Sequence, residues 1–299
     1  MRIATSPWVL LLFLLGGCAT LPAKAPGEIL QPGIYRVSDG LRTSSVDFFD
    51  LLQEEKIVYV GETHDNDTHH KIQAQILEGL MRRAPGRVAL GMEMFQRPFQ
   101  RHLDDFVNGK IDEGKMLELT EYEDRWGFDF SFYRPLLRMV VSQGSCVLAL
   151  NASKELTKRV REVGFDGLDE AEAAMVPPSA LQRNDRHFKM FSDAMGGSHA
   201  ELKGEKLERF YRVQVVWDAV MADSAIRGTA ARPQIEILVV VAWVLHVKDG
   251  LGVPRHVESL GGPTGVVVIP MESDSTKPIY KDEVVGSGVG DFVWISAPD

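Results

Sequence analysis

The sequence predicts an α/β fold, with a mainly parallel central sheet flanked by helices and a mostly helical insertion or subdomain. Short apolar runs rich in β-branched residues alternate with helical patterns along the chain, which is typical of parallel strands buried on both faces. The 299 residues are 44% hydrophobic and 25% charged. This composition indicates a globular protein with a full core and excludes a disordered, collagen-like or coiled-coil chain.

Five apolar runs are predicted to be strands, at residues 57–60, 88–92, 147–150, 235–245 and 266–269. The fourth run contains Glu236 and is too short to cross a bilayer, so we expect a buried strand there. Four helices are predicted between the strands, at about residues 68–83, 98–107, 153–163 and 201–227.

Polar residues mark the expected ends of these helices. Asp67 and Ser153 are expected N-caps, and Pro85-Gly86 ends the first helix. The stretch 165–200 is polar and contains Pro177-Pro178 and Gly196-Gly197, so we expect it to be irregular.

The N-terminus has the pattern of a secretion signal. A positive charge precedes a short apolar run, and Leu15-Gly16-Gly17 leads to Cys18. These residues resemble the lipobox of bacterial lipoproteins, which implies that residues 1–17 are removed and Cys18 is lipidated. The alternative is an ordinary signal peptide with a cysteine there by chance. The lipobox implies a lipid-anchored protein of the bacterial cell envelope, and Ala19 favours the outer membrane.

The expected domain organisation follows from these patterns. Residues 18–44 are predicted to be the lipidated cysteine and a tether, residues 45–275 the folded domain, and residues 276–299 a C-terminal tail. The helical insertion is expected at about residues 110–230. With Cys18 lipidated, Cys146 has no partner for a disulfide and is expected to be a buried, unreactive thiol.

The charge of the chain argues against a nucleic-acid partner. Lys and Arg number 33 against 42 Asp and Glu, which gives a formal net charge of −9. Binding to a phosphate backbone requires a basic face, and the sequence contains no basic run.

Ionisable and amide side chains follow four of the predicted strands. Glu62 and His64 follow the first, Glu93 the second, Asn151 the third, and His246 lies near the end of the fourth. Open α/β sheets bind ligands at the carboxyl ends of their strands, so we expect these residues to converge. Such groups suit metal ligation or acid–base chemistry. The alternatives are a solvated turn for Glu62 and His64 and a helix-capping carboxylate for Glu93.

The residues around this predicted site resemble the ChaN-like haem-binding uptake family. The resemblance rests on Gly61-Glu62-Thr63-His64-Asp65-Asn66, on Gly91-Met92-Glu93-Met94-Phe95, and on His246 with Gly250-Leu251-Gly252-Val253-Pro254. Further matches are Trp126, Tyr133-Arg134-Pro135, Ala149-Leu150-Asn151, Gln214, Asp218, Met221 and Ala222. The family is related to Tiki and TraB-type proteases and to erythromycin esterases. The resemblance implies a lipoprotein that binds haem in iron acquisition.

One position departs from the family pattern. Where the family usually has a glycine turn before the last histidine, this chain has Trp243-Val244-Leu245. Glycines would let the backbone approach a ligand closely, whereas these residues are expected to extend a buried strand. The departure puts a metal site and hydrolysis in doubt more than haem binding.

The resemblance leaves the haem contacts open. Axial ligands of haem include Tyr, His and Met, and the weak candidates are Tyr122, Tyr133, Met190 and Met195. Cations would have to receive the haem propionates. The candidates for this role are Lys71, Arg97, Arg101 and Arg125.

Three functions follow as hypotheses. The first is a haem-binding lipoprotein, with the membrane as partner through Cys18 and with an outer-membrane uptake protein or a second copy as further partners. The second is a hydrolase with Glu62, His64, Glu93 and His246 as catalytic residues, either metal-dependent through His64 and His246 or based on His and Glu alone. The third is an inactive scaffold that anchors a partner.

Overall fold

The computed structural model describes residues 27–198 and 203–297. In this part of the chain an eight-stranded sheet has the order β2-β1-β8-β7-β3-β6-β4-β5. The strands are β1 (Gly33–Arg36), β2 (Arg42–Thr43), β3 (Ile57–Glu62), β4 (Val88–Gln96), β5 (Val147–Asn151), β6 (Ile237–Trp243), β7 (Val266–Glu272) and β8 (Phe292–Ser296). The six strands from β8 to β5 are parallel, and β1 and β2 are antiparallel additions at one edge. The predicted fold class is therefore confirmed.

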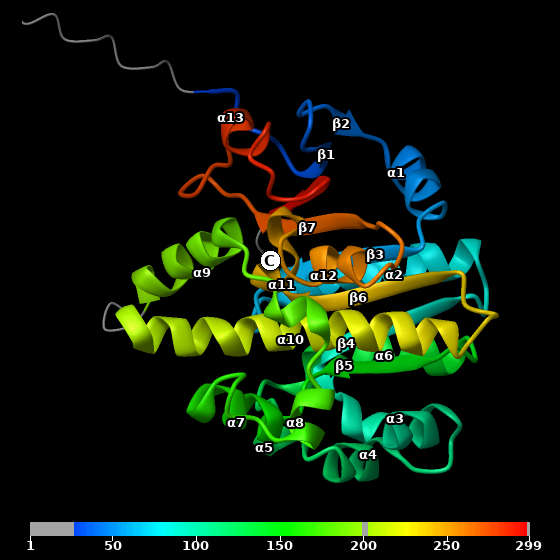
Figure 1. Cartoon of the computed structure of the whole chain (residues 1–299). Helices are drawn as coiled ribbons and strands as arrows, with labels where there is room; N and C mark the ends of the chain where they lie inside the picture. The colour runs from blue at the N-terminus through cyan, green and yellow to red at the C-terminus, as the bar shows by residue number, and fades with distance from the viewer. Residues whose placement is uncertain (1–26, 199–202, 298–299) are drawn as a thin grey trace, which may run out of the picture.

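Helices cover both faces of the sheet (Figure 1). The α-helices are α1 (Ser45–Leu52), α2 (Asp67–Arg83), α3 (Gln100–Val107), α4 (Glu113–Leu119), α5 (Tyr122–Arg125), α6 (Arg134–Ser142), α7 (Lys154–Val163), α8 (Glu170–Ala174), α9 (Asp185–Ser198), α10 (Gly204–Ala230), α11 (Val244–Val247), α12 (Val253–Ser259) and α13 (Lys281–Val284). Short 3₁₀ turns are η1 (Arg97–Phe99), η2 (Phe130–Phe132), η3 (Pro178–Leu181) and η4 (Lys248–Gly250). No helix in the described ranges is long and apolar enough to cross a membrane.

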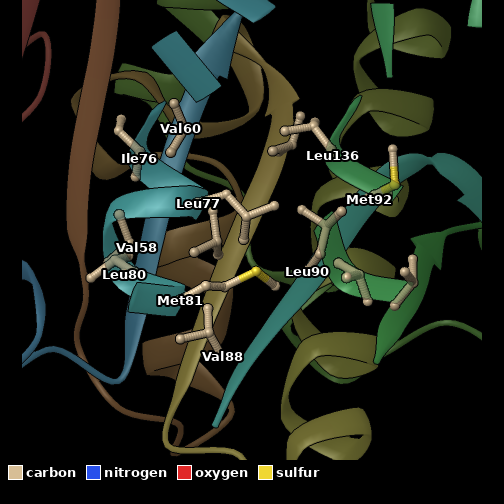
Figure 2. Close-up of a cluster of buried hydrophobic side chains, with 14 of the residues drawn as sticks. Val58, Val60, Ile76, Leu77, Leu80, Met81, Val88, Leu90, Met92 and Leu136 are labelled. Carbon is tan, nitrogen blue, oxygen red and sulfur yellow. The ribbon is translucent and has the colours of Figure 1, made fainter. Parts of the chain in front are cut away.

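Alternate residues of each central strand fill two separate cores, because successive side chains of a strand point to opposite faces. On β3, Val58 packs with α1, α2 and α6, whereas Tyr59 belongs to the core under α10 and α12. Figure 2 shows apolar side chains of α2, including Ile76 and Leu80, packed against strand residues of the first core.

Local sequence explains α2. Its buried apolar residues recur at helical spacing, and the Asn66 side chain accepts a hydrogen bond from the His69 N–H. Asn66, rather than the expected Asp67, is therefore the N-cap. Asp67 lies in the first turn, where its charge is favourable beside the helix N-terminus. The Ser153 cap of α7 forms as expected.

The sheet extends beyond the predicted domain boundaries. Residues 33–36 and 42–43 of the predicted tether form β1 and β2, and residues 292–296 of the predicted tail form β8. β8 pairs in parallel with β7 and antiparallel with β1, so these short edge strands gain their order from pairing across the chain. Residues 1–17 and Cys18 lie outside the described residues.

Two expectations about the middle and late chain are wrong. The stretch 165–200 contains α8, η3 and α9 rather than irregular structure, and Asp169 begins α8 with a capping box. Residues 110–230 are mostly helical and also contain the predicted strand β5, and α10 within them packs on the sheet. The strand predicted over 235–245 ends at Trp243, and Val244–Val247 forms α11.

Candidate functional site

The candidate site lies at the carboxyl ends of β3, β4, β5 and β6. Glu62 is the last residue of β3, Asn151 the last of β5 and Trp243 the last of β6. The pairing of β4 with β5 shifts register between Met92 and Gln96. Such an irregularity redirects side chains next to it, and Glu93 lies within it. The sheet thus brings the strand-end residues together at one edge. These residues are Glu62, His64, Glu93, Asn151 and His246, as predicted.

Glu62 and His64 form a close pair. Glu62 is 1% exposed, and its Oε1 lies 2.6 Å from His64 Nδ1. Glu62 Oε2 has no hydrogen-bond partner in the described residues, and His70 Nε2 lies 4.0 Å from it. Burial raises the pKa of Glu62 above its usual value. Burial alone would lower the pKa of His64, but the hydrogen bond to Glu62 and the charge of Glu93 raise it.

Aromatic rings hold His64 in place. Its ring centroid lies 4.8 Å from that of Trp126, 4.7 Å from that of Phe128 and 5.9 Å from that of Trp243. The side chain remains 21% exposed. His64 is therefore fixed in orientation and still accessible from one side.

His246 is held by two carboxylates. Its Nε2 lies 3.1 Å from Glu93 Oε1 and its Nδ1 lies 2.5 Å from Asp218 Oδ1. Gln214 Nε2 lies 3.0 Å from the same Nδ1. Burial opposes the charge, but Glu93 and then Asp218 raise the pKa of His246 to about 10. The ring is therefore a buried imidazolium whose two nitrogens are both engaged at neutral pH.

Glu93 accepts two hydrogen bonds. Besides His246, the backbone N–H of Trp243 donates to Glu93 Oε2 at 2.7 Å. Burial would raise the pKa of Glu93, but the charge of His246 and these hydrogen bonds lower it. The bond to Trp243 also marks the point where β6 ends and α11 begins. Glu93 is thus ionised although it is buried, and it connects β4 with the end of β6.

A second layer of polar groups lies behind His246. His187 Nε2 lies 3.5 Å from Asp218 Oδ2, and Tyr211 contacts the other side of His187. His256 is fully buried, and neither of its ring nitrogens has a hydrogen-bond partner in the described residues. Burial lowers the pKa of His256 to about 4, so this ring is neutral at physiological pH.

A cavity of about 320 Å³ opens at this edge of the sheet. Its lining combines three indole rings, two cations and several polar groups. The residues are His64, Glu93, Met94, Gln96, Arg125, Trp126, Asn151, Lys154, Thr157, Trp217, Trp243 and His246. A cavity of this size lies at the lower end of the range for small-molecule sites, which is about 300–1,000 Å³.

The weak axial-ligand candidates do not line this cavity. Tyr122 is 4% and Tyr133 0% exposed, and both belong to the core under α2 and α6. Burial raises the pKa of each phenol well above its usual value. Met195 packs with Tyr211 in a separate cluster.

Of the four cations expected near haem propionates, Arg125 lines the cavity. Lys71 pairs with Asp67, Arg97 with Asp223 and Arg101 with Asp105. Lys154 also lines the cavity, and the sequence reasoning did not single it out. It stands at the first position of α7, directly after the Ser153 cap.

The structure gives no support to the predicted metal site. Within residues 27–198 and 203–297, no group of three or more His, Cys, Asp and Glu side chains is arranged to hold a metal ion. The two predicted metal ligands instead contact carboxylates of the protein. His64 contacts Glu62, and His246 contacts Glu93 and Asp218.

Asp218 and Gln214 were named only as family matches in the sequence analysis and were not predicted to belong to the site. Asp218 and Gln214 are polar and buried on α10, four residues apart, so both face His246 from one side of the helix. This polar pair inside an otherwise apolar helix face was the available signal.

Comparison with known proteins relates the chain to one family. The family model described as "Haem-binding uptake, Tiki superfamily, ChaN" matches residues 48–257. A solved structure of ChaN of Campylobacter jejuni, described as binding haem cofacially, is 18% identical over 87% of this chain and 94% of that chain, with a TM-score of 0.68. This likeness shows a shared fold.

Two other solved structures match less closely. The type III effector HopBA1 is 10% identical over 93% of this chain and all of that chain (100%), with a TM-score of 0.48. A mutant of the erythromycin esterase EreC in its open conformation is 14% identical over 90% of this chain and 83% of that chain, with a TM-score of 0.45. No curated protein matches the chain.

Proposed function

Because the chain belongs to the haem-binding uptake family ChaN of the Tiki superfamily, we propose that it binds haem in the cavity at the sheet edge and acts in bacterial haem or iron acquisition. The observation that supports this placement is the cavity lining, which offers an imidazole, three indoles and two cations together. Haem needs an axial ligand for its iron, apolar contacts for its macrocycle and cations for its propionates.

The residues present fit these requirements. Trp126, Trp217 and Trp243 provide flat apolar surfaces, and indole rings stack favourably against other aromatic systems. Arg125 and Lys154 would receive the propionates. Haem supplies iron as the cargo of the pathway, and the protein binds and orients it. The volume of 320 Å³ encloses part of a haem, so an edge of the macrocycle would stay outside the cavity.

Charge is available at the mouth of the cavity. The Arg125 side chain is 13% exposed and already pairs with Glu121 and Glu155, which are 52% and 67% exposed. Lys154 donates from Nζ to the carbonyl oxygen of Asp124. A propionate would replace exposed carboxylates around Arg125, which costs little because surface ion pairs contribute only about 0–1 kcal/mol.

The proposal includes anchoring to the cell envelope, with lipid on Cys18 after removal of residues 1–17 and the outer membrane as the site. The sequence pattern at Leu15-Gly16-Gly17-Cys18 supports it. Metabolic labelling with palmitate tests it: the wild-type chain should incorporate label, and Cys18→Ala should not. Label on the variant would refute lipidation at Cys18.

A haemin titration tests the haem function. The full-length protein, purified in detergent, should give a saturable shift of the Soret band, with detergent alone as the blank. Absence of a saturable shift would refute the proposal. Light scattering on the loaded protein would show whether a second copy takes part, as the sequence-based hypothesis of a homo-oligomer requires.

The Glu62–His64 pair favours a second candidate function, hydrolysis without a metal. A histidine oriented by a buried carboxylate can act as a general base toward water. In this role Glu62→Gln should abolish turnover of whichever ester or amide the protein accepts. If haem binds but no ester or amide of a substrate panel is hydrolysed, the hydrolase candidate fails. If neither haem binding nor hydrolysis is found, the scaffold hypothesis remains.

A further inference from the structure

We propose that the face of the molecule at which the described chain begins rests on a phospholipid bilayer, with the Arg42 guanidinium on a lipid phosphate and with Leu41 and Val46 inserted between the headgroups. This membrane face is formed by β1, β2, α1 and α13. The inference rests on the proposed lipid on Cys18 and is independent of the haem function.

Exposed apolar side chains are concentrated near the start of the described chain. Within residues 27–198 and 203–297, eight large hydrophobic side chains are exposed, and half of them fall within residues 29–51. Scattered apolar residues are normal on a protein surface, whereas a group on one face marks an interaction surface. The four side chains and their exposed fractions are Ile29 at 45%, Leu41 at 56%, Val46 at 62% and Leu51 at 48%.

The fold brings this segment next to the point where the chain enters it. A Cβ on Gly27 would lie 2.5 Å from the Asp282 carboxylate of α13, and a Cβ on Gly40 would lie 2.9 Å from the Lys281 side chain of the same helix. The start of the described chain, α13 and the turn before Leu41 are therefore side by side. α1 follows directly after β2, and these elements lie together at the top of the view in Figure 1.

A hollow of about 540 Å³ opens on the membrane face. Arginine and hydroxyl groups donate hydrogen bonds of the kind that phosphate oxygens accept. Indole rings are enriched at the level of lipid headgroups, because their body is apolar and their N–H is polar. The hollow combines these groups, since it is lined by Gly33, Ile34, Arg42, Thr43, Ser44, Ser45 and Trp294.

The Arg42 guanidinium is available for a phosphate. Its Nη2 donates to the carbonyl oxygen of Pro32 at 3.0 Å, and it contacts no carboxylate in the described part of the chain. Because carboxylates accompany the neighbouring cations, the contact with lipid does not require an anionic bilayer. These neutralised pairs are Arg36 with Asp39 and Lys281 with Glu28.

The proposed anchor keeps this face close to the bilayer. Nine residues lead from Cys18 to Gly27, and an extended chain spans at most about 3.3–3.6 Å per residue, so the two are at most about 30 Å apart. β2 is the edge strand of the sheet, and strands about 4.8 Å apart place β4 about 30 Å from it. The candidate cavity therefore stays in water while the opposite edge of the sheet contacts lipid.

A fluorescent label on the lipidated full-length protein tests the proposal. In a Cys146→Ala background, Leu41→Cys and Val46→Cys each provide one reactive thiol, because lipid on its sulfur blocks Cys18. An environment-sensitive fluorophore at either position should emit at shorter wavelength and severalfold more strongly on vesicles of phosphatidylethanolamine and phosphatidylcholine. Quenching of this emission by iodide in the water should fall severalfold.

Matched controls come from exposed positions elsewhere in the fold. Val163→Cys on α7 and Leu181→Cys at the end of η3 carry the same label on side chains that are 38% and 63% exposed. Their emission should stay that of a label in water. Arg42→Glu should return the label at Leu41→Cys toward this control value, whereas Arg209→Glu on the exposed face of α10 should leave it unchanged.

The outcomes separate this proposal from the others. Equal emission and equal quenching at all four labelled positions would overturn it alone. A shift that appears without vesicles and grows with protein concentration would assign the face to a second copy, and a shift caused by inorganic phosphate alone would assign Arg42 to a free anion. Absence of palmitate label on the wild type would overturn the anchor and this inference together, and haemin binding would stand in every case.

Discussion

Removing the charge of Asp218 is expected to destabilise the protein near neutral pH and to weaken the pH dependence of its stability. Asp218 is fully buried, and its Oδ1 lies 2.5 Å from His246 Nδ1. Asp218→Asn leaves a neutral side chain of the same shape next to a buried imidazolium. Glu93 then remains as the one carboxylate in contact with His246 among the described residues.

The magnitude follows from the cost of disturbing a buried ion pair. Loss of one partner of such a pair costs about 3–5 kcal/mol. Because asparagine still offers an acceptor oxygen to Nδ1, we expect the lower end of that range, about 3 kcal/mol near pH 6. The free energy of unfolding should report this loss directly.

The raised pKa of His246 determines how the free energy of unfolding changes with pH. The pKa of His246 is about 10 in the folded protein, above the ordinary value of 6.5. A raised pKa means that the stabilisation is complete below pH 6.5 and is lost as the pH rises toward 10. At about 1.4 kcal/mol for each pKa unit, this loss amounts to at most about 5 kcal/mol for the wild type. In the variant the folded-state pKa is lower, so the loss is smaller.

Urea denaturation at several pH values between 6 and 9.5 would measure both effects. The gap between the wild type and Asp218→Asn should be largest near pH 6 and should narrow as the pH rises. Asp193→Asn is the control, since Asp193 pairs with Lys189 on an exposed face of α9, and its effect should stay within about 0.5 kcal/mol at every pH. A gap between wild type and Asp218→Asn that does not change with pH would show that His246 is not the buried cation described here.

Three further predictions follow. Substituting His256 by Leu should leave stability near neutral pH almost unchanged and should reduce the loss of stability as the pH falls from 6.5 to about 4, as acid denaturation would show, because a buried imidazole with a lowered pKa must gain a proton on unfolding; an unchanged acid transition would contradict this. Gly79→Ala should lower the free energy of unfolding by about 1–3 kcal/mol, because a Cβ there would overlap a phenylalanine ring of α1. Gly196→Ala in α9, where a Cβ meets no other atom, should raise the free energy of unfolding by about 0.5–1 kcal/mol. Thermal denaturation would compare the two variants, and equal effects would refute the packing argument. Arg125→Ala and Lys154→Ala should each weaken haemin binding and reduce its dependence on salt, as titrations at two ionic strengths would show; binding and salt dependence like those of the wild type would exclude both as propionate contacts.

The central strands and helices were predictable because their signals are local. The apolar spacing of α2 and the serine cap of α7 are visible in a few consecutive residues. The end of β6 was not predictable in this way. Trp243 stops the strand where its N–H donates to Glu93, which lies 150 residues away in the sequence. A run of apolar residues carries no information about such a distant partner.

Distant contacts also explain why the edge strands β1 and β8 and the site residue Asp218 were not predicted from the sequence. β1 and β8 pair with each other across nearly the whole chain, so neither is recognisable from its own few residues. Asp218 comes from α10, and its contact with His246 exists only once that helix lies along the sheet. The strand-end residues converge because parallel strands share one carboxyl edge, which topology alone predicts.

The departure from the family pattern before His246 has a structural effect that the sequence comparison did not suggest. Trp243 stands between the two histidines of the site, with ring centroids 5.9 Å from His64 and 6.0 Å from His246. Gly61 allows this arrangement, since a Cβ there would lie 2.9 Å from Ile269 Cδ1 and 3.2 Å from Val247 Cγ2 and would crowd β7 and α11. A glycine at position 243 would leave a gap between the two rings and let His64 rotate. The Trp243 indole instead lies between His246, whose two ring nitrogens both contact carboxylates, and His64, which contacts a carboxylate through Nδ1 alone. Among the contacts of the described residues, His64 is therefore engaged at Nδ1 alone, whereas His246 is engaged at both ring nitrogens.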